Sequence, residues 1–312
     1  MSKQAVLLIA HGSPECVEDI PEFLQNISRG RPMSDAVVRE VQHRYSLIGV
    51  SPLTCMTVGQ ANGVARELGI AAYVGMRNWH PFIADTLKQM KGDGVEQAVA
   101  ICLAPHNSRT SVGLYKQVLF GAGAPFAIDF VEEWHDHPLL IEAFADRLRT
   151  GWKSACEQHG SLLPVLFTAH SVPQRTIAEG DPYEAQTRET AALVAAQVPE
   201  IAPWSFAFQS QGMSGGEWLG PTVEDTITGL RDAGQSGVFV QPIGFVCDHV
   251  EILFDVDILF RQFAEARGMK LYRAESLNDS PQFVQAVADL ARARLAALER
   301  PCSSGIETER IS

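Results

Sequence analysis

The sequence has few of the features that mark membrane, secreted or nucleic-acid-binding proteins. Its longest apolar stretches, such as residues 98–104, are far shorter than the roughly 20 residues that cross a membrane. The apolar run near the N-terminus, residues 5–10, is too short for the core of a signal peptide. Basic residues are also scarce. The chain has 25 Lys and Arg against 37 Asp and Glu, and the resulting net charge of −12 argues against general nucleic-acid binding.

Cysteine is rare and dispersed. The 6 cysteines form no Cys-x-x-Cys pair and no compact cluster, so in a chain of 312 residues we expect reduced, mostly structural thiols. No GxGxxG or Walker motif occurs in the glycine-containing loops 12–14 and 212–216, which argues against a nucleotide site. The remaining composition, 46% hydrophobic and 20% charged, is typical of a globular protein. We therefore expect a soluble, cytoplasmic protein.

Short apolar runs alternate along the chain with longer segments of helical period. The expected strands are 5–10, 71–76, 95–104, 126–131, 163–169, 204–209, 237–243 and 270–273. Helical patterns occur at 17–27, 34–48, 81–90, 137–156, 183–197, 223–232, 250–267 and 282–298. This alternation predicts an α/β fold with parallel sheets covered by helices on both faces. The strands divide evenly at 157–162, so we expect domains at 1–160 and 161–300 and a disordered tail at 301–312.

The two halves open with similar segments. Residues 6–14 read Val-Leu-Leu-Ile-Ala-His-Gly-Ser-Pro, and residues 165–173 read Val-Leu-Phe-Thr-Ala-His-Ser-Val-Pro. This repeat predicts two four-stranded parallel sheets related by a pseudo-two-fold axis, with a cleft between them. Chance is the alternative, because strands and Ala-His pairs are common. If the repeat holds, His11 and His170 both lie at carboxyl ends of first strands, where α/β sheets place ligands.

His170 is the first candidate for chemistry. It follows an apolar strand and precedes Ser-Val-Pro, which stops the strand, so its side chain should point into a crevice. A histidine there can bind a metal or act as a base near neutral pH. The alternative is a histidine that caps a strand end and is satisfied by the backbone.

A helix with stacked carboxylates is the second candidate. Asp248, Glu251 and Asp255 are spaced i, i+3 and i+7, which predicts three acids on one face of an otherwise apolar helix. Such acids are costly when buried unless a cation or a solvent pocket faces them. Together with His170 they favour a path for a divalent cation such as iron(II), manganese or zinc. Ordinary placement of acids in a first helical turn is the alternative, and it suits all but Asp255.

A basic segment is the third candidate. Arg29 and Arg31 lie in a loop, and Arg44 and Tyr45 lie on the helix that follows. Several arginines in an acidic protein suggest bidentate recognition of carboxylate or phosphate. Cations that complement the end of a helix are an equally good explanation. The pair His135 and His137 could bind metal, although polar surface residues are the more common explanation for such spacing.

His170, Asp248 and Glu251 belong to motifs that are similar to those of a known family. The motifs are Gly-Val-Ser-Pro-Leu at 49–53, Trp-His-Pro-Phe-Ile at 79–83, Leu-Ala-Pro-His at 103–106, Thr-Ala-His-Ser-Val-Pro at 168–173, Gly-Asp-Pro-Tyr at 180–183, Trp-Leu-Gly-Pro at 218–221 and Gly-Phe-Val-Cys-Asp-His-Val-Glu at 244–251. From about residue 6 to 290 the chain resembles the ferrochelatases, and within them the monofunctional Gram-positive form that acts on coproporphyrin. The resemblance implies two Rossmann-like domains with a porphyrin cleft between them.

The resemblance also implies roles for individual residues. His170 and Glu251 match the family's catalytic and metal-binding histidine and glutamate, which lie on opposite sides of the porphyrin centre, and Asp255, a further expected metal-binding residue, continues the acidic line. His11 stands where close relatives carry a tyrosine that touches iron, so we expect it to bind haem iron axially. The implied substrate-binding residues are Arg29, Arg31, Arg44, Tyr45, Ser51 and Tyr115. Two departures are notable: Leu259 replaces a further acid, and the loop before Ser51 is one residue shorter.

The resemblance implies a lyase of haem biosynthesis that inserts Fe²⁺ into coproporphyrin III to give coproheme. Fe²⁺ is then a substrate, and no cofactor is permanently bound. We expect no iron–sulfur cluster because Cys302 alone cannot hold one. We expect a monomer whose partners are the porphyrin, Fe²⁺ and other haem-pathway enzymes. The alternatives are a protoporphyrin IX ferrochelatase, a chelatase for another metal such as cobalt, and a non-catalytic haem-binding protein.

Overall fold

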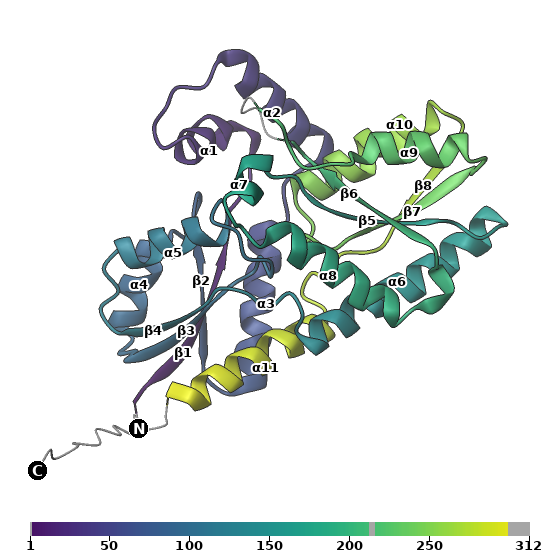
Figure 1. The fold of residues 1–312 in the computed structure, drawn as a ribbon. Helices are drawn as coiled ribbons and strands as arrows, with labels where there is room; N and C mark the ends of the chain where they lie inside the picture. Colours follow the sequence, from purple (N-terminus) through teal and green to yellow (C-terminus); the bar gives the residue numbers. More distant parts are fainter. Residues whose placement is uncertain (1, 212–215, 299–312) are drawn as a thin grey trace, which may run out of the picture.

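The computed structural model describes residues 2–211 and 216–298, and within them two parallel sheets (Figure 1). The first sheet has the order β2-β1-β3-β4 and the second the order β6-β5-β7-β8. Their strands are β1 (Gln4–Ala10), β2 (Ala71–Met76), β3 (Gln97–Cys102), β4 (Ala127–Val131), β5 (Val165–His170), β6 (Trp204–Gln209), β7 (Gly237–Pro242) and β8 (Lys270–Arg273). The prediction of two equivalent four-stranded parallel sheets is confirmed. Since β1 and β5 hold the same place in their sheets, the repeated segments are also equivalent in the fold.

Helices cover the faces of both sheets. In the first half these are α1 (Ile20–Ile27), α2 (Asp35–Ile48), α3 (Leu53–Leu68), α4 (Ile83–Gly92), α5 (Val112–Gly121) and α6 (Pro138–His159). In the second half they are α7 (Gln174–Ala178), α8 (Tyr183–Ala196), α9 (Val223–Asp232), a π-helix (Glu251–Phe260), α10 (Arg261–Glu265) and α11 (Pro281–Leu298). Short 3₁₀ turns occur at Val17–Asp19 and Pro199–Ile201. The predicted helices are all present, but α3, α5 and α7 were not among them.

Helix α3 was missed because glycines interrupt its helical signal. A Cβ atom added to Gly63 would lie 2.7 Å from a methyl carbon of Val284 on α11. The glycine therefore allows two helices to approach closely, and the packing offsets its low helix propensity. The packing of α3 against α11, rather than local helix propensity, therefore explains why this segment is helical.

The core explains why each strand is apolar along its whole length. In β1, the side chains of Val6, Leu8 and Ala10 pack into a core shared by both sheets, while Leu7 and Ile9 pack on the opposite face beneath α4 and α5. All five are buried, as expected for parallel strands covered on both faces. The predicted sheet packing therefore follows directly from the apolar runs.

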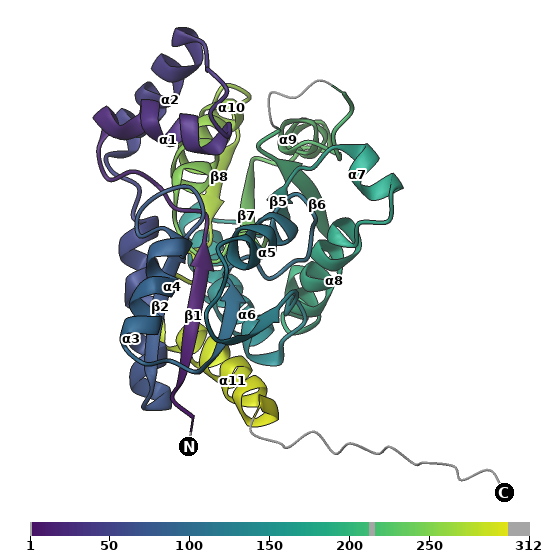
Figure 2. The same ribbon diagram turned by 90° about the vertical axis from the view of Figure 1, so that its left-hand side faces the viewer.

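The last helix returns to the first sheet. Helix α11 packs against α3 and β3, while α6 lies along α8 and β7 of the second half (Figures 1 and 2). The helix at the end of each half thus crosses to the other sheet, and the predicted domain bounds at 160 and 300 stay predictions. The predicted tail at 301–312 lies outside the described residues. In the described part of the chain, no helix combines the length and apolar character needed to cross a membrane.

The strand order places the loops that carry function. In each sheet the chain leaves the first strand (β1 or β5) and the third (β3 or β7) toward opposite sides, and crevices form where connections diverge in this way. The four loops that follow β1, β3, β5 and β7 therefore converge on one region between the two sheets.

Candidate active site

A cleft of about 700 Å³ lies where these four loops meet. Its walls include His11 after β1 and His170 to Pro173 at the end of β5. After β3 they include Ala104, His106, Thr110 and Ser111, and after β7 they include Gly244 to Cys247 and His249 to Glu251. Helices α1 and α2 add Phe23, Leu24, Arg44 and Tyr45 above it. The volume is in the range of about 300–1,000 Å³ that is usual for small-molecule sites.

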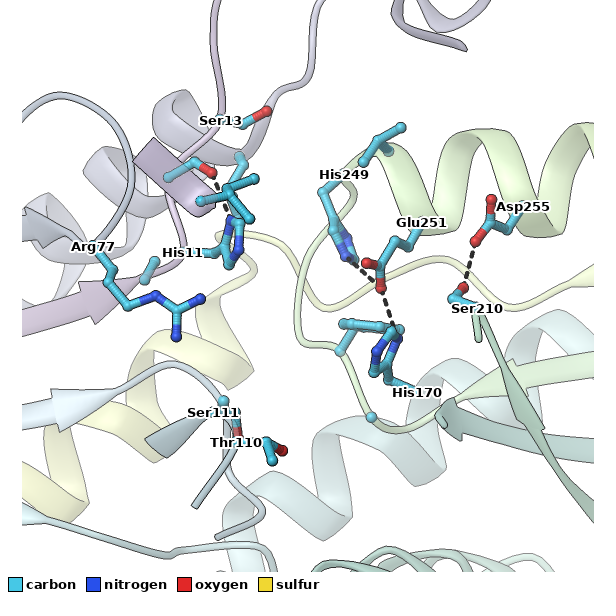
Figure 3. Close-up of a pocket in the computed structure, with 18 of the residues that line it drawn as sticks. His11, Ser13, Arg77, Thr110, Ser111, His170, Ser210, His249, Glu251 and Asp255 are labelled. Atoms are coloured by element: carbon cyan, nitrogen blue, oxygen red, sulfur yellow. Dashed lines mark hydrogen bonds and ion pairs between the residues drawn. The ribbon is translucent and has the colours of Figure 1, made fainter. Parts of the chain in front are cut away.

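His170 and Glu251 lie together on one wall of the cleft (Figure 3), so the expectation that they flank its centre from opposite sides is wrong. Nδ1 of His170 lies 3.2 Å from Oε2 of Glu251, and about a third of each side chain is exposed to the cleft. Gly244 lets the loop after β7 approach this point, because a Cβ atom there would lie 2.9 Å from the backbone of Ala169. The strand end and the start of the π-helix thereby hold an imidazole and a carboxylate in contact.

The electrostatics of this pair favour a charged imidazole beside a carboxylate. Burial, the largest single effect, would lower the pKa of His170, but the charge and hydrogen bond of Glu251 together with the charge of Asp255 outweigh it and raise that pKa above its usual value. Burial likewise opposes ionisation of Glu251, while His170 and then His249 hold the pKa of its carboxyl well below the usual range. Nε2 of His249 lies 3.9 Å from Glu251, and its ring packs against Phe245. The site can therefore hold a proton or a cation between imidazole and carboxylate.

Asp255 lies one π-helical turn beyond Glu251. Its carboxylate accepts a hydrogen bond from Ser210, and Nη1 of Arg44 lies 4.0 Å away. Burial and the nearby charge of Glu251 raise the pKa of Asp255 to about 6, against the opposing effects of Ser210 and Arg44. This carboxyl can therefore gain or lose a proton near neutral pH.

The predicted stack of three acids is wrong for Asp248. The helix begins after this residue and its first ten residues are π-helical, so the α-helical spacing that would align Asp248 with Glu251 does not apply. Asp248 instead accepts hydrogen bonds from Ser276 and Asn278, at 2.7 and 3.0 Å. Of the three acids, Glu251 and Asp255 line the cleft and Asp248 does not.

His11 lies on the wall opposite His170, where the repeat predicted it (Figure 3). Burial, and next the positive charge of Arg77, lower its pKa to about 4, so the ring is neutral. Its Nδ1 lies 3.0 Å from the Gly12 carbonyl oxygen, and its Nε2 lies 3.0 Å from the side-chain amide of Asn78. Binding of iron through Nε2 requires the ring to leave Asn78, and this role of His11 stays a prediction.

The predicted substrate-binding residues divide into three groups. Arg44, Tyr45 and Tyr115 line the cleft, and the hydroxyl of Tyr45 lies 2.8 Å from that of Ser13. Arg29 and Arg31 line a second hollow that shares Ile27 with the cleft. Ser51 is buried, does not line the cleft, and its Oγ has no hydrogen-bond partner among the described residues.

The structure adds cleft residues that the sequence reasoning did not select. His249 lies between Glu251 and the His11 wall, and its place inside the Asp-His-Val-Glu motif was an available signal. Arg77 follows β2 directly and stacks over Tyr115, with 4.9 Å between its guanidinium carbon and the ring centre. Thr110 and Ser111 also line the cleft, just before the missed helix α5. The position of Arg77 directly after an apolar strand was the available signal for this residue.

The histidines of the Trp-His-Asp-His segment have other partners. Nε2 of His135 lies 3.0 Å from Glu189, and Nε2 of His137 lies 3.4 Å from Asp289. Neither histidine lines the cleft. Across residues 2–211 and 216–298, no three His, Cys, Asp or Glu side chains are arranged as a metal-binding group.

Comparisons with known proteins agree with this geometry. The family model described as Ferrochelatase matches residues 3–295. The chain is 52% identical to a ferrochelatase of Acidobacterium capsulatum, over 96% of this chain and 98% of that protein. It is 34% identical to a coproporphyrin III ferrochelatase of a Geobacillus species, over 94% and 98% of the two chains.

Solved structures share the fold at low sequence identity. The structure described as SirB from Bacillus subtilis with Fe3+ aligns with a TM-score of 0.59 and 12% identity, over 95% of this chain and 97% of that one. This likeness supports the two-domain α/β architecture. The family match spans almost the whole chain and includes both walls of the cleft. The chain belongs to the ferrochelatase family.

Proposed function

We propose that this protein inserts Fe²⁺ into coproporphyrin III. The observation that carries the proposal is the contact between His170 and Glu251 inside a cleft large enough for a tetrapyrrole, with His11 on the facing wall. A flat macrocycle held between these walls has its central nitrogens between His170 and His11. That is the position from which both protons and metal must be exchanged.

Insertion of a metal ion into a porphyrin requires three changes. The macrocycle must bend so that nitrogen lone pairs become accessible, two pyrrole protons must leave, and the iron must lose its water ligands. In its neutral form the imidazole of His170 accepts protons and binds the ion, while Glu251 compensates the charge. Asp255, whose pKa is raised to about 6, extends the acidic path from this pair toward Ser210 and Arg44.

The arginines of the cleft mouth support coproporphyrin as the substrate. Coproporphyrin carries four propionates, whereas protoporphyrin carries two propionates and two vinyl groups. Arg44 lines the cleft, and the hollow with Arg29 and Arg31 joins the cleft at Ile27. Propionates that reach this rim meet guanidinium groups suited to carboxylates, whereas vinyl groups cannot form such pairs. The coproporphyrin III ferrochelatases among the relatives also support this choice.

The metal and the reaction are tested together. Coproporphyrin fluorescence is followed under anaerobic conditions with Fe²⁺, with Co²⁺ and without metal. We expect rapid loss of fluorescence with Fe²⁺. Loss with Co²⁺ alone would place the protein among cobalt chelatases, and binding without metal insertion would make it a porphyrin-binding protein.

The substrate is tested by the ratio of kcat/KM for coproporphyrin III to that for protoporphyrin IX. Each partly exposed arginine–propionate pair is worth about 1 kcal/mol after solvent screening, or about fivefold, so the wild-type ratio should exceed about tenfold. The double variant Arg29→Ala with Arg44→Ala should lower this ratio of kcat/KM values toward one. Arg39→Ala removes an exposed arginine of α2 that does not line the cleft, and it should leave the ratio unchanged. A ratio unaffected by the double variant would contradict the proposal.

A further inference from the structure

Arg273, at the end of β8, holds one side of the π-helix through a two-pronged contact. Its Nε donates to Oδ1 of Asp257 and its Nη2 to Oδ2, both at 2.8 Å. Only 12% of the arginine side chain is exposed. This is the planar, paired geometry that arginine provides and lysine cannot.

The same guanidinium also reaches the segment before the π-helix. Nη1 of Arg273 lies 3.4 Å from Oδ1 of Asp248, donates to the Ala274 carbonyl at 2.9 Å, and lies 3.4 Å from Oγ of Ser276. Ser276 and Asn278, from the loop that follows β8, complete the contacts of the Asp248 carboxylate. One arginine and one loop therefore hold acids on both sides of Glu251 and Asp255.

The ion pairs of Arg273 with Asp248 and Asp257 stabilise an unusual helix. A π-helix is rare and usually only one turn long, and it often occurs at functional sites. Here it runs over Glu251–Phe260 and carries both cleft carboxylates. Arg261 also links the π-helix to β8, because its Nε donates to the Asp257 carbonyl and its Nη1 donates to the Leu271 carbonyl on β8.

The cleft side shows why the register of this helix matters. Glu251 contacts His170 on β5, and Asp255 contacts Ser210 beyond β6, so the two acids face partners on neighbouring strand ends. A small rotation or shift of the π-helix would separate both pairs together. Misplacement of reacting groups by about 1 Å can cost about a hundredfold in rate.

We propose that Arg273 is a positioning residue for metal insertion: by clamping Asp248 and Asp257, it fixes the π-helix so that Glu251 meets His170. The proposal rests on the proposed function. Arg273 acts through these two acids and does not line the cleft, so it contributes to turnover without contacting the porphyrin.

The test compares Arg273→Gln, Arg273→Lys and Asp257→Asn with the wild-type protein. Iron insertion gives kcat and the KM values for Fe²⁺ and for coproporphyrin III, porphyrin fluorescence gives the Kd for porphyrin, and thermal unfolding reports folding. The matched control is Arg294→Gln. It breaks another two-pronged pair, in which Arg294 on α11 donates to Asp129 on β4 at 2.7 and 2.6 Å, away from the cleft.

We expect Arg273→Gln to lower kcat by about tenfold to a hundredfold, while the Kd for porphyrin changes less than about twofold. Arg273→Lys should rescue little, since an ammonium cannot make the two-pronged contact. Asp257→Asn should also lower kcat. In the double variant Arg273→Gln with Asp257→Asn, kcat should fall by a smaller factor than the product of the two single factors, because both substitutions break the same contact. Arg294→Gln should retain wild-type kcat.

The outcomes separate the inference from the function on which it rests. A wild-type protein that inserts no iron contradicts the proposed function. An active wild-type protein together with folded Arg273→Gln of unchanged kcat contradicts the positioning role alone. Full rescue by Arg273→Lys, or an equal loss of kcat in Arg294→Gln, would also overturn it. If Arg273→Gln does not fold, Arg273→Lys and Asp257→Asn give the same comparison.

Discussion

Replacing His170 with alanine separates its chemical role from its structural one. The side chain ends β5 and faces the cleft, and about a third of it is exposed. Removing it opens space toward solvent rather than a closed cavity in the core. We therefore expect a loss in free energy of unfolding of about 1 kcal/mol or less, because large losses come from closed cavities or broken buried networks.

The expected loss of activity is much larger. The variant lacks both the proton acceptor and the nitrogen that binds the ion, while Glu251 keeps its charge without its imidazole partner. Loss of a general base alone costs about a hundredfold to ten-thousandfold in rate. We expect His170→Ala to insert iron at least about a hundredfold more slowly than the wild type.

The assay measures anaerobic fluorescence loss of coproporphyrin with Fe²⁺, alongside the Kd for porphyrin and the free energy of unfolding. His80→Ala is the control, because it removes an exposed histidine that does not line the cleft. Porphyrin binding should persist in both variants. A folded His170→Ala protein with normal iron insertion would refute the assignment.

Three further predictions concern neighbouring residues. Glu251→Gln removes the charge that raises the pKa of His170, so that pKa should fall in an NMR titration and iron insertion should slow by about tenfold or more; an unchanged His170 pKa would contradict the pairing. If His11 binds haem iron, the absorption spectrum of the bound product should be that of low-spin, histidine-ligated iron and should change in His11→Ala; an unchanged spectrum would leave His11 a structural residue. Burial, reinforced by the charge of His135, lowers the pKa of His106 to about 3, so the unfolded chain takes up this proton first as the pH falls below 6.5. The contribution of His106 to stability should therefore fall by about 2 kcal/mol between pH 8 and pH 5, so in denaturant unfolding the stability of His106→Gln should drop by about 2 kcal/mol less than that of the wild type; equal drops would contradict this assignment.

The sheets were predictable because their signal is local. Each strand of a covered parallel sheet is an apolar run, and all eight runs became strands within a few residues of their predicted ends. The repeated Ala-His segments then located His11 and His170 at equivalent strand ends. Chain order alone could not show that α11 returns to the first sheet, because that contact joins segments far apart in the sequence.

The site was predictable in part. His170, Glu251 and Asp255 stood out because charged groups next to apolar elements need a partner. The predicted position of Asp248 failed because it assumed an α-helix, and a π-helix has no distinct sequence period to reveal it. The contacts of Arg273 with Asp248 and Asp257 escaped notice because they join residues 16 to 25 positions apart through tertiary packing.

Competition between two porphyrins in one reaction tests the central claim most directly. Coproporphyrin III and protoporphyrin IX are mixed at equal concentrations with limiting Fe²⁺ and the wild-type protein, and the two iron products are quantified. The arginines at the rim of the cleft predict that coproheme forms in at least about tenfold excess over protohaem. Equal amounts, or an excess of protohaem, would contradict the proposal that this cleft selects a substrate with four propionates.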